Sequence, residues 1–251
     1  MAGHSKWANI KHRKARMDAQ KGKIFTKISK EIMAAVRAGG PDPDGNFRLR
    51  LALQKARAVN MPNDNIARAI QKGSGETDGV NYEEIVYEGY GPAGTAVMLE
   101  ILTDNRNRTA AEIRHIFSRR GGSLGETGCV AWMFSRRGYL TVNKKEWDED
   151  ELMLLALEAG AADFEADDDF YTIHTEVGDF EQVKEKLEAE GVTFAEASIT
   201  MVPVNTVEIT DLEEAKKAVA LIEQLEDHDD VQNVYTNLDL PPEIAAALEN
   251  E

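Results

Sequence analysis

The first 30 residues of the chain hold nine lysine and arginine side chains and a single acid, Asp18. Ammonium and guanidinium groups at this density favour phosphate binding, because a helix face that needed only solvation would mix the two signs of charge. The residues that we expect to contact nucleic acid in this segment are Lys6, Trp7, Lys11, His12, Arg13, Lys14, Arg16, Lys21, Lys23, Lys27 and Lys30.

The charge of the whole chain is sorted by position. Residues 1–72 carry 16 Lys and Arg against 5 Asp and Glu, residues 141–251 carry 6 against 31, and the formal net charge of the chain is −16. A basic block in an acidic protein is the electrostatic pattern expected of a chain that meets a polyanion. We therefore expect nucleic acid to contact the N-terminal part, while the acidic part repels it or binds a basic protein partner.

A second group of arginines lies in the middle of the chain. Arg106 and Arg108 follow a predicted strand and open a predicted helix, where guanidinium groups could contact phosphate. The same stretch could serve structure alone, since Thr109 and Glu112 have the spacing of a capping box and Asp104 suits the loop before a helix. The sequence leaves both roles open, and we include the two arginines in the expected nucleic-acid site.

Catalytic chemistry has weak support. Cys129 is the only cysteine and could act as a nucleophile with His115 as its base, but its apolar neighbours favour a small buried residue instead. Gly89, Gly91 and Gly94 have G-x-G-x-x-G spacing, yet a predicted strand follows them where a dinucleotide site requires a helix. We predict no catalytic residue, no cofactor and no enzymatic activity.

Metal binding has no stronger basis. His4 and His12 do not form a close ligand pair. The run Asp167-Asp168-Asp169 is most simply a solvated loop, although its carboxylates could in principle hold Mg²⁺. We predict no metal site.

Three helices are predicted to carry the basic block. Residues 1–20 lack an apolar period and are expected to be a flexible arm that orders on its ligand. The first helix has an apolar face that includes Ile28 and Ile32, and lysines lie opposite. The third begins near residue 63, with Gly73 expected in a left-handed conformation after its last turn. The second and third helices could form a helix-turn-helix whose base-reading residues would be Asn65, Arg68, Gln71 and Lys72.

From residue 82 onward the pattern changes to alternating strands and helices. This pattern predicts an α+β fold in which antiparallel sheets are covered on one face. The predicted strands are 84–88, 95–102, a hairpin of 130–134 with 139–142, 170–175, 197–202, 206–209 and 231–237. The predicted helices are 107–120, 149–159, 180–190 and 212–225.

Several sequence blocks are recognisable. The chain opens with MAGHSKWANIKHRK, and further blocks are GKIFTK from residue 22, NMP from residue 60, YEGYGP from residue 87 and LTDNRNRT from residue 102. These blocks resemble those of the YebC/PmpR family, which includes the mitochondrial translational activator of cytochrome c oxidase. The resemblance covers residues 1–135 densely and the acidic remainder more loosely.

The resemblance implies three domains and a role in gene expression without catalysis. The implied domains are a basic helical domain with its arm at 1–76, an α+β domain from 77–134 and 204–240, and an acidic α+β domain at 135–203 inserted in the second. Members of the family are described as DNA-binding transcriptional regulators, and others as translation factors that act at the ribosome. The resemblance therefore defines the class of ligand better than the process.

A DNA-binding transcriptional regulator is our first hypothesis, because the helical domain permits docking on DNA. The alternative is a ribosome-associated translation factor that binds ribosomal RNA, with Trp7, Tyr87 and Tyr90 stacking on bases. We expect a cytoplasmic protein without membrane contact, because no apolar run approaches about 18 residues and one cysteine excludes an intramolecular disulfide. The sequence does not predict the oligomeric state.

Electrostatic binding by the basic block predicts a steep dependence on salt. If about five of its cations each neutralise a phosphate, raising salt from about 50 to about 200 mM lowers the affinity by roughly 10² to 10³. Changing Lys11, Arg13 and Lys14 to Ala should weaken binding to all sequences about equally, since phosphate contacts carry no sequence information. Fluorescence anisotropy with labelled DNA duplexes measures both effects, and an affinity that stays constant across this salt range would contradict the prediction.

Overall fold

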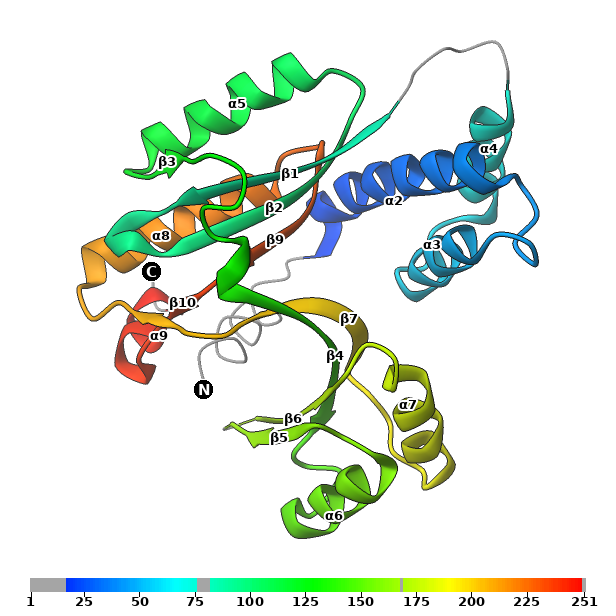
Figure 1. Cartoon of the computed structure of the whole chain (residues 1–251), viewed down its shortest axis with the longest axis vertical. Helices are drawn as coiled ribbons and strands as arrows, with labels where there is room; N and C mark the ends of the chain where they lie inside the picture. Colours follow the sequence, from blue (N-terminus) through cyan, green and yellow to red (C-terminus); the bar gives the residue numbers. More distant parts are fainter. Residues whose placement is uncertain (1–16, 76–81, 168, 250–251) are drawn as a thin grey trace.

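A computed structural model describes residues 17–75, 82–167 and 169–249 of the chain. Helices and mostly antiparallel strands alternate in this part of the chain, with a helical region followed by two four-stranded sheets, which confirms the expected α+β fold class (Figure 1). None of the described helices combines the length and the apolar character that a membrane span needs.

The helical region consists of α2 (Met17–Gly39), α3 (Phe47–Ala58) and α4 (Asn63–Ser74). All three helices contribute to its core, which includes Ile32, Leu49 and Ala69. Asn46 begins α3: its side-chain oxygen accepts a hydrogen bond from the backbone N–H of Leu49 (3.0 Å), and its amide nitrogen donates to the carbonyl of Ala35 (2.8 Å). One buried side chain therefore caps α3 and also fastens it to α2.

Gly73 has a different role from the one that the sequence suggested. It lies inside α4, where a β-carbon would be 2.9 Å from Cβ of Val36 and 3.0 Å from the carbonyl oxygen of Met33 on α2. The helix ends at Gly75, which has φ −75°. The expected left-handed ending is therefore wrong, and Gly73 instead allows α2 and α4 to approach closely.

The central sheet has the strand order β3-β1-β2-β9 with antiparallel neighbours. Its strands are β1 (Glu83–Tyr90), β2 (Ala96–Thr103), β3 (Ser123–Leu124) and β9 (Val231–Thr236). The helices α5 (Arg106–Arg119) and α8 (Leu212–Glu226) pack on one face, where Leu99, Phe117 and Leu225 share a core. The expectation that only one face is covered is wrong for β2, because Met98 packs with Val130 in a second core on the opposite face.

The glycine-rich motif forms the turn between β1 and β2. A short 3₁₀ segment, η1 (Pro92–Gly94), lies in this turn, and the N–H of Gly91 donates to the carbonyl of Thr95 (2.7 Å). A strand follows the motif, which confirms that it lacks the helix of a dinucleotide site.

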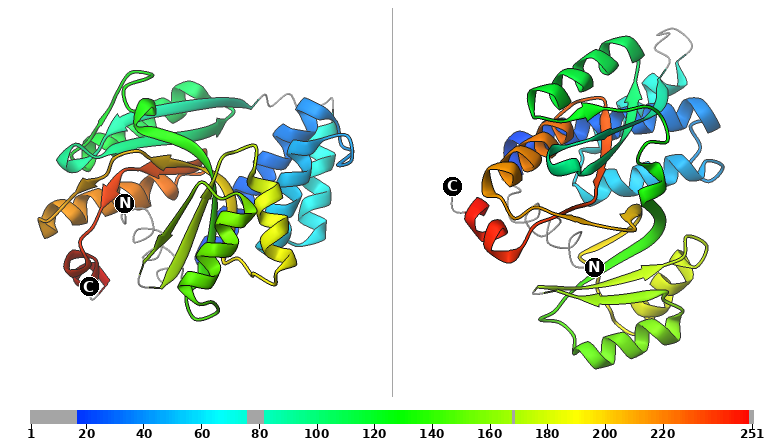
Figure 2. Two further views of the ribbon diagram at one scale, coloured as in Figure 1. Left: turned by 60° about the horizontal axis from the view of Figure 1, so that its bottom comes forward. Right: turned by 60° about the vertical axis from the view of Figure 1, so that its left-hand side comes forward.

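The second sheet has the order β5-β6-β4-β7, again with antiparallel neighbours. Its strands are β4 (Phe134–Asn143), β5 (Asp163–Ala166), β6 (Phe170–Thr175) and β7 (Glu196–Pro203). The helices α6 (Glu149–Ala159) and α7 (Phe180–Ala189) share a core with it that includes Leu140, Leu152 and Val183. Figure 2 shows β4 leading away from the central sheet into this unit.

The hairpin expected between residues 130 and 142 is instead one long strand, β4, preceded by a 3₁₀ turn, η2 (Ala131–Met133). Gly138, between the two segments of the expected hairpin, lies within the sheet between Thr175 and Ile199. A β-carbon at Gly138 would be 2.1 Å from Oγ1 of Thr175 and 2.6 Å from Cδ2 of Phe180. Glycine is therefore present because α7 packs closely on β4 there, and not because the chain turns.

Several short elements were not expected from the sequence, because strands of two to four residues show no measurable period. These elements are β3, β5 and β10 (Leu238–Asp239), of which β10 pairs in parallel with β8 (Val207–Glu208). The helix α9 (Pro242–Glu249) was also missed.

A buried carboxylate fixes the loop that leads into β4. Glu88 on β1 accepts hydrogen bonds from the backbone N–H groups of Gly128 (2.7 Å), Val130 (2.8 Å) and Ala131 (2.8 Å). Burial raises the pKa of Glu88, but these three hydrogen bonds outweigh it and lower the pKa below its ordinary value. Burial and the neighbouring Glu88 charge raise the pKa of the Cys129 thiol in this loop, which disfavours a nucleophilic role.

Removing the Glu88 carboxylate should therefore destabilise the protein. We expect Glu88→Ala to lower the free energy of unfolding by about 2 to 4 kcal/mol, because three backbone N–H groups lose their acceptor. Glu83→Ala, at an exposed position of the same strand, should change it by less than about 0.5 kcal/mol. Urea unfolding measures both variants, and equal effects would show that the Glu88 hydrogen bonds contribute little.

Candidate nucleic-acid interface

The structure places only some of the residues expected to contact nucleic acid. Lys23, Lys27 and Lys30 lie on α2, and Arg106 and Arg108 lie in the first turn of α5. The side chains that fall outside the described part of the chain are those of Lys6, Trp7, Lys11, His12, Arg13, Lys14, Arg16 and Lys21.

The lysines of α2 contact an acidic segment of the same chain, residues 226–230, which joins α8 to β9. Lys23 pairs with Asp227 (3.3 Å), and the ammonium group of Lys27 donates to the carbonyl of Glu226. Lys30 donates to the carbonyl of Asp229 (3.0 Å) and to Oδ1 of Asp230 (2.7 Å). Basic residues that the charge pattern assigned to phosphate therefore hold the helical region against the central sheet, across about 200 residues of sequence.

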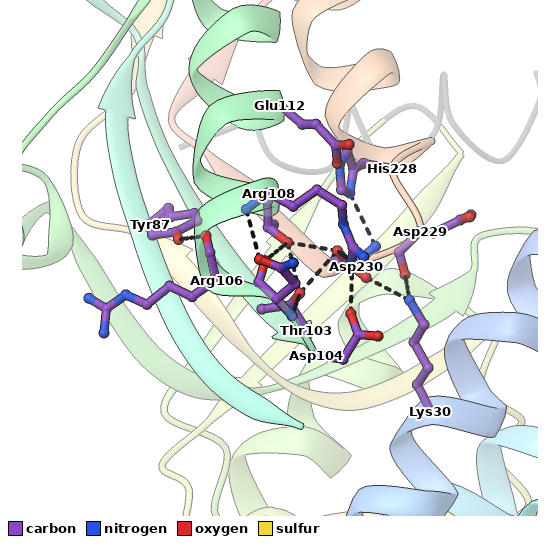
Figure 3. A network of polar contacts seen from close by, with 12 residues as sticks. Lys30, Tyr87, Thr103, Asp104, Arg106, Arg108, Glu112, His228, Asp229 and Asp230 are labelled. Atoms are coloured by element: carbon purple, nitrogen blue, oxygen red, sulfur yellow. Dashed lines mark hydrogen bonds and ion pairs between the residues drawn. The ribbon is translucent and has the colours of Figure 1, made fainter. Parts of the chain in front are cut away.

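Asp230 is the centre of this contact (Figure 3). Its side chain is only 4% exposed. Its Oδ2 accepts hydrogen bonds from Arg108 (2.8 Å), Thr109 (2.7 Å) and Thr103 (3.1 Å), while Lys30 occupies Oδ1. Burial alone would raise the pKa of Asp230, but hydrogen bonds from Lys30, Arg108 and Thr109 outweigh it and hold the pKa well below its ordinary range.

The segment between β2 and α5 is built to supply these donors. The hydroxyl of Thr103 accepts from the N–H of Asn105 (3.0 Å), and the side chain of Asn105 caps α5 by accepting from the N–H of Arg108 (3.1 Å). The capping box expected from Thr109 and Glu112 is therefore wrong. The helix begins four residues earlier than that box requires, at Arg106, and the Thr109 hydroxyl donates to the buried carboxylate instead.

The two arginines of this segment have different surroundings. Arg108 pairs with Asp104 (2.9 Å) as well as with Asp230 (2.8 Å). Arg106 extends away from the Asp230 network in Figure 3, and no carboxylate pairs with it in the part of the chain that the structure covers. The structure thus gives Arg108 a role within the fold, while phosphate contact by Arg106 stays a prediction.

Glu112, His228 and Asp230 place ligand atoms within 4.8 Å of one another, as a metal site would. Their hydrogen bonds instead connect these residues directly to one another. The N–H of Asp230 donates to Nδ1 of His228 (3.1 Å), so Nε2 carries the proton that faces Glu112 (2.9 Å). The carboxylate of Asp230 is already occupied by two cations and two hydroxyls, so this cluster does not fit a metal ion.

Other cations of the helical region remain exposed. Arg57 on α3 and Arg68 and Lys72 on α4 form no ion pair with any side chain of residues 22–75, 82–167 or 169–248. Four residues join the two helices, and among them Asn60 is left-handed with φ 55°. Arg57 was not included in the expected nucleic-acid site, although the helical period already placed it on the flank of the predicted helix, away from Leu49 and Leu53.

The Asp230 network predicts a stability effect that depends on pH. Asp230→Asn is expected to lower the free energy of unfolding by about 3 kcal/mol at pH 7, because Lys30 and Arg108 lose their buried partner charge. Folding lowers the pKa of Asp230 from the ordinary 3.8, so its contribution is complete above that value and is lost as pH falls below it. The difference between wild type and variant should therefore stay constant from about pH 7 to about pH 5 and narrow as pH falls from there to about pH 2.

Asp229→Asn is the matched control for this experiment. Asp229 is exposed and contacts Lys30 through its carbonyl, which the substitution leaves in place. Denaturant unfolding at several pH values compares the two variants. If both variants lost the same free energy of unfolding, or if the loss did not change with pH, the Asp230 charge would not hold the helical region against the central sheet.

Comparison with known proteins divides the chain at the same place as the structure, between the helical region and the two sheets. Residues 5–76 match the model of the TACO1/YebC protein N-terminal domain, and residues 82–238 match the TACO1/YebC second and third domain. A probable transcriptional regulatory protein of Halothermothrix orenii is 58% identical over 253 residues, and the match covers 100% of both chains. A probable transcriptional regulatory protein of Natranaerobius thermophilus is 60% identical over 243 residues, and that match covers 96% of this chain and 97% of the relative. The crystal structure of a conserved hypothetical protein from Aquifex aeolicus matches with a TM-score of 0.80 and 48% identity, over 91% of this chain and 94% of that one. The chain therefore belongs to the TACO1/YebC family.

Proposed function

We propose that the chain is a cytoplasmic, non-enzymatic regulator of transcription that binds DNA through its helical region. Relatives that match it over their full length carry the name probable transcriptional regulatory protein. The excess of cations in residues 1–72 supports a polyanionic ligand. The raised pKa of the Cys129 thiol supports a role without nucleophilic catalysis.

The observation that carries this proposal is the exposed face of α4. Arg68, Gln71 and Lys72 are exposed and lie on the side of the helix opposite Ile66 and Ala69, which are buried. Arginine, glutamine and lysine are the side chains that most often read guanine and adenine in the major groove. An exposed helix that follows another helix after a four-residue connection is suited to enter that groove.

The anchoring of α2 supports the same arrangement. Lys23, Lys27 and Lys30 hold the N-terminal and middle turns of α2 on the acidic segment 226–230. α4 packs against the C-terminal turns of α2, near Val36, so it lies away from the anchored turns (Figure 1). The contact with residues 226–230 therefore leaves the outer face of α4 open to a ligand.

DNA is preferred over RNA for a geometric reason. The major groove of B-DNA admits an α-helix, whereas the deep, narrow groove of A-form RNA does not. The aromatic residues expected to stack on RNA bases also have other contacts: Tyr90 donates to the carbonyl of Cys129 (2.9 Å), and Tyr87 packs against the central core. Binding to ribosomal RNA is therefore the second hypothesis and is an outcome of the test below.

Loss of the α4 cations should change the salt dependence of binding. Arg68→Ala with Lys72→Ala is expected to lower the affinity for a DNA duplex about tenfold or more and to reduce the slope of log affinity against log salt by about 1.8. The matched control is Lys145→Ala with Lys217→Ala, which removes the same charge from exposed positions elsewhere. Fluorescence anisotropy between about 50 and about 200 mM salt measures both variants.

Two results would overturn the proposal. If the α4 variant and the control had the same slope, α4 would not contact phosphate. If an RNA hairpin bound wild type more tightly than the duplex at every salt concentration, and if the α4 variant lost RNA binding equally, the translation hypothesis would replace transcription.

A further inference from the structure

The solvent-facing side of α6 carries large apolar side chains. Leu154 is 58% exposed, Leu157 is 54% exposed and Met153 is 38% exposed. Leu154 and Leu157 lie away from Leu152 and Ala156, which are fully buried against the second sheet, and Met153 lies between the two faces. Helix α6 is therefore apolar on its outer face as well as on the face that the fold requires.

Helix α7 shows that the fold does not require this second apolar face. It packs on the same sheet and buries Val183 and Leu187 in the same core as α6. Its exposed positions nevertheless hold polar or charged side chains and one alanine, and they include Glu181, Gln182 and Glu185. The leucines exposed on α6 are thus a property of that helix and not of the domain.

Charge identifies what kind of molecule could cover this face. Acids border it on α6, with Asp150 and Glu158 beside the leucines, and the helix contains no lysine or arginine. The segment 135–203 that contains α6 has 18 acids against 6 Lys and Arg. A polyanion would be repelled over about 8 to 10 Å, so a nucleic acid is excluded and a protein with basic side chains is favoured.

We propose that the outer face of α6, formed by Asp150, Met153, Leu154, Leu157 and Glu158, is a docking surface for a basic amphipathic helix of a protein partner. Apolar side chains spaced three and four residues apart on the partner helix pack between Leu154 and Leu157. Lysines or arginines that flank them reach Asp150 and Glu158. Three apolar side chains within less than two helical turns form a small interface, so the contact is transient.

A designed pair of peptides tests the proposal on the full chain. The first is a labelled 15-residue peptide of leucine and lysine with all leucines on one helical face, and the second has the same composition with leucines spread around the helix. Wild type should bind the first peptide at least about tenfold more tightly than the second, because only the first can bury a continuous apolar stripe. Fluorescence anisotropy measures both affinities.

Protein variants locate the contact. Leu154→Ser with Leu157→Ser should weaken binding of the first peptide about tenfold without changing net charge. Val177→Ser with Ile199→Ser is the matched control, because it removes two other exposed apolar side chains from the same domain. Asp150→Asn with Glu158→Gln should weaken binding and lower its salt dependence. Thermal unfolding of the leucine variant should match wild type, since both leucines are more than half exposed.

Three outcomes would overturn the proposal. The first is equal binding of the two peptides, which would indicate attraction by charge alone. The second is a loss of affinity for the first peptide that is as large in the control variant as in the leucine variant. The third is a wild-type dimer in sedimentation that the leucine variant does not form, because a second copy of the chain would then cover α6.

Discussion

An ionised carboxylate can be buried only if hydrogen-bond donors and cations replace the water that it loses. Asp230 meets this requirement with donors from two distant parts of the sequence, Lys30 on α2 and the Thr103, Arg108 and Thr109 side chains at the start of α5. Asp230 is the buried part of the contact between the helical region and the central sheet, which also includes the exposed ion pair of Lys23 with Asp227. The position at which α5 begins, Arg106, and the docking of the α2 lysines both help to compensate the buried charge of Asp230.

Glu88 is a second buried carboxylate whose charge is compensated by hydrogen bonds. No cation among the described side chains pairs with it, and three backbone N–H groups of the loop before β4 compensate its charge instead. Both carboxylates keep their charge because their hydrogen bonds outweigh burial. Two of the sequence blocks that identify the family, YEGYGP and LTDNRNRT, therefore contain residues that hold buried charge within the fold, which is a structural requirement and not a ligand contact.

The sequence predicted most of the larger elements, because periods of 3.6 and 2 residues over ten or more positions are strong signals. The sequence was less informative where one residue type can serve two different structural roles. Gly73 was interpreted as a helix end and residues 130–142 as a hairpin, although Gly73 packs tightly against Val36, and Gly138 within β4 packs tightly against Phe180. The charge pattern located the cations of α2, but a phosphate and a carboxylate attract lysine equally, so it could not show that Lys30 binds Asp230. That pairing depends on tertiary structure.

The pairing of β2 with β9 has a consequence for synthesis of the chain. The two strands lie side by side in the central sheet, although β2 ends at Thr103 and β9 begins at Val231. All four strands of the second sheet come from the segment between them. As the chain leaves the ribosome, the second sheet has all its partners before β9 has been made, whereas β2 has one edge unpaired until then. The order of residues along the chain thus lets the second sheet and its helices fold first. The edge of β2 stays unpaired, and therefore open to aggregation, until β9 has been made.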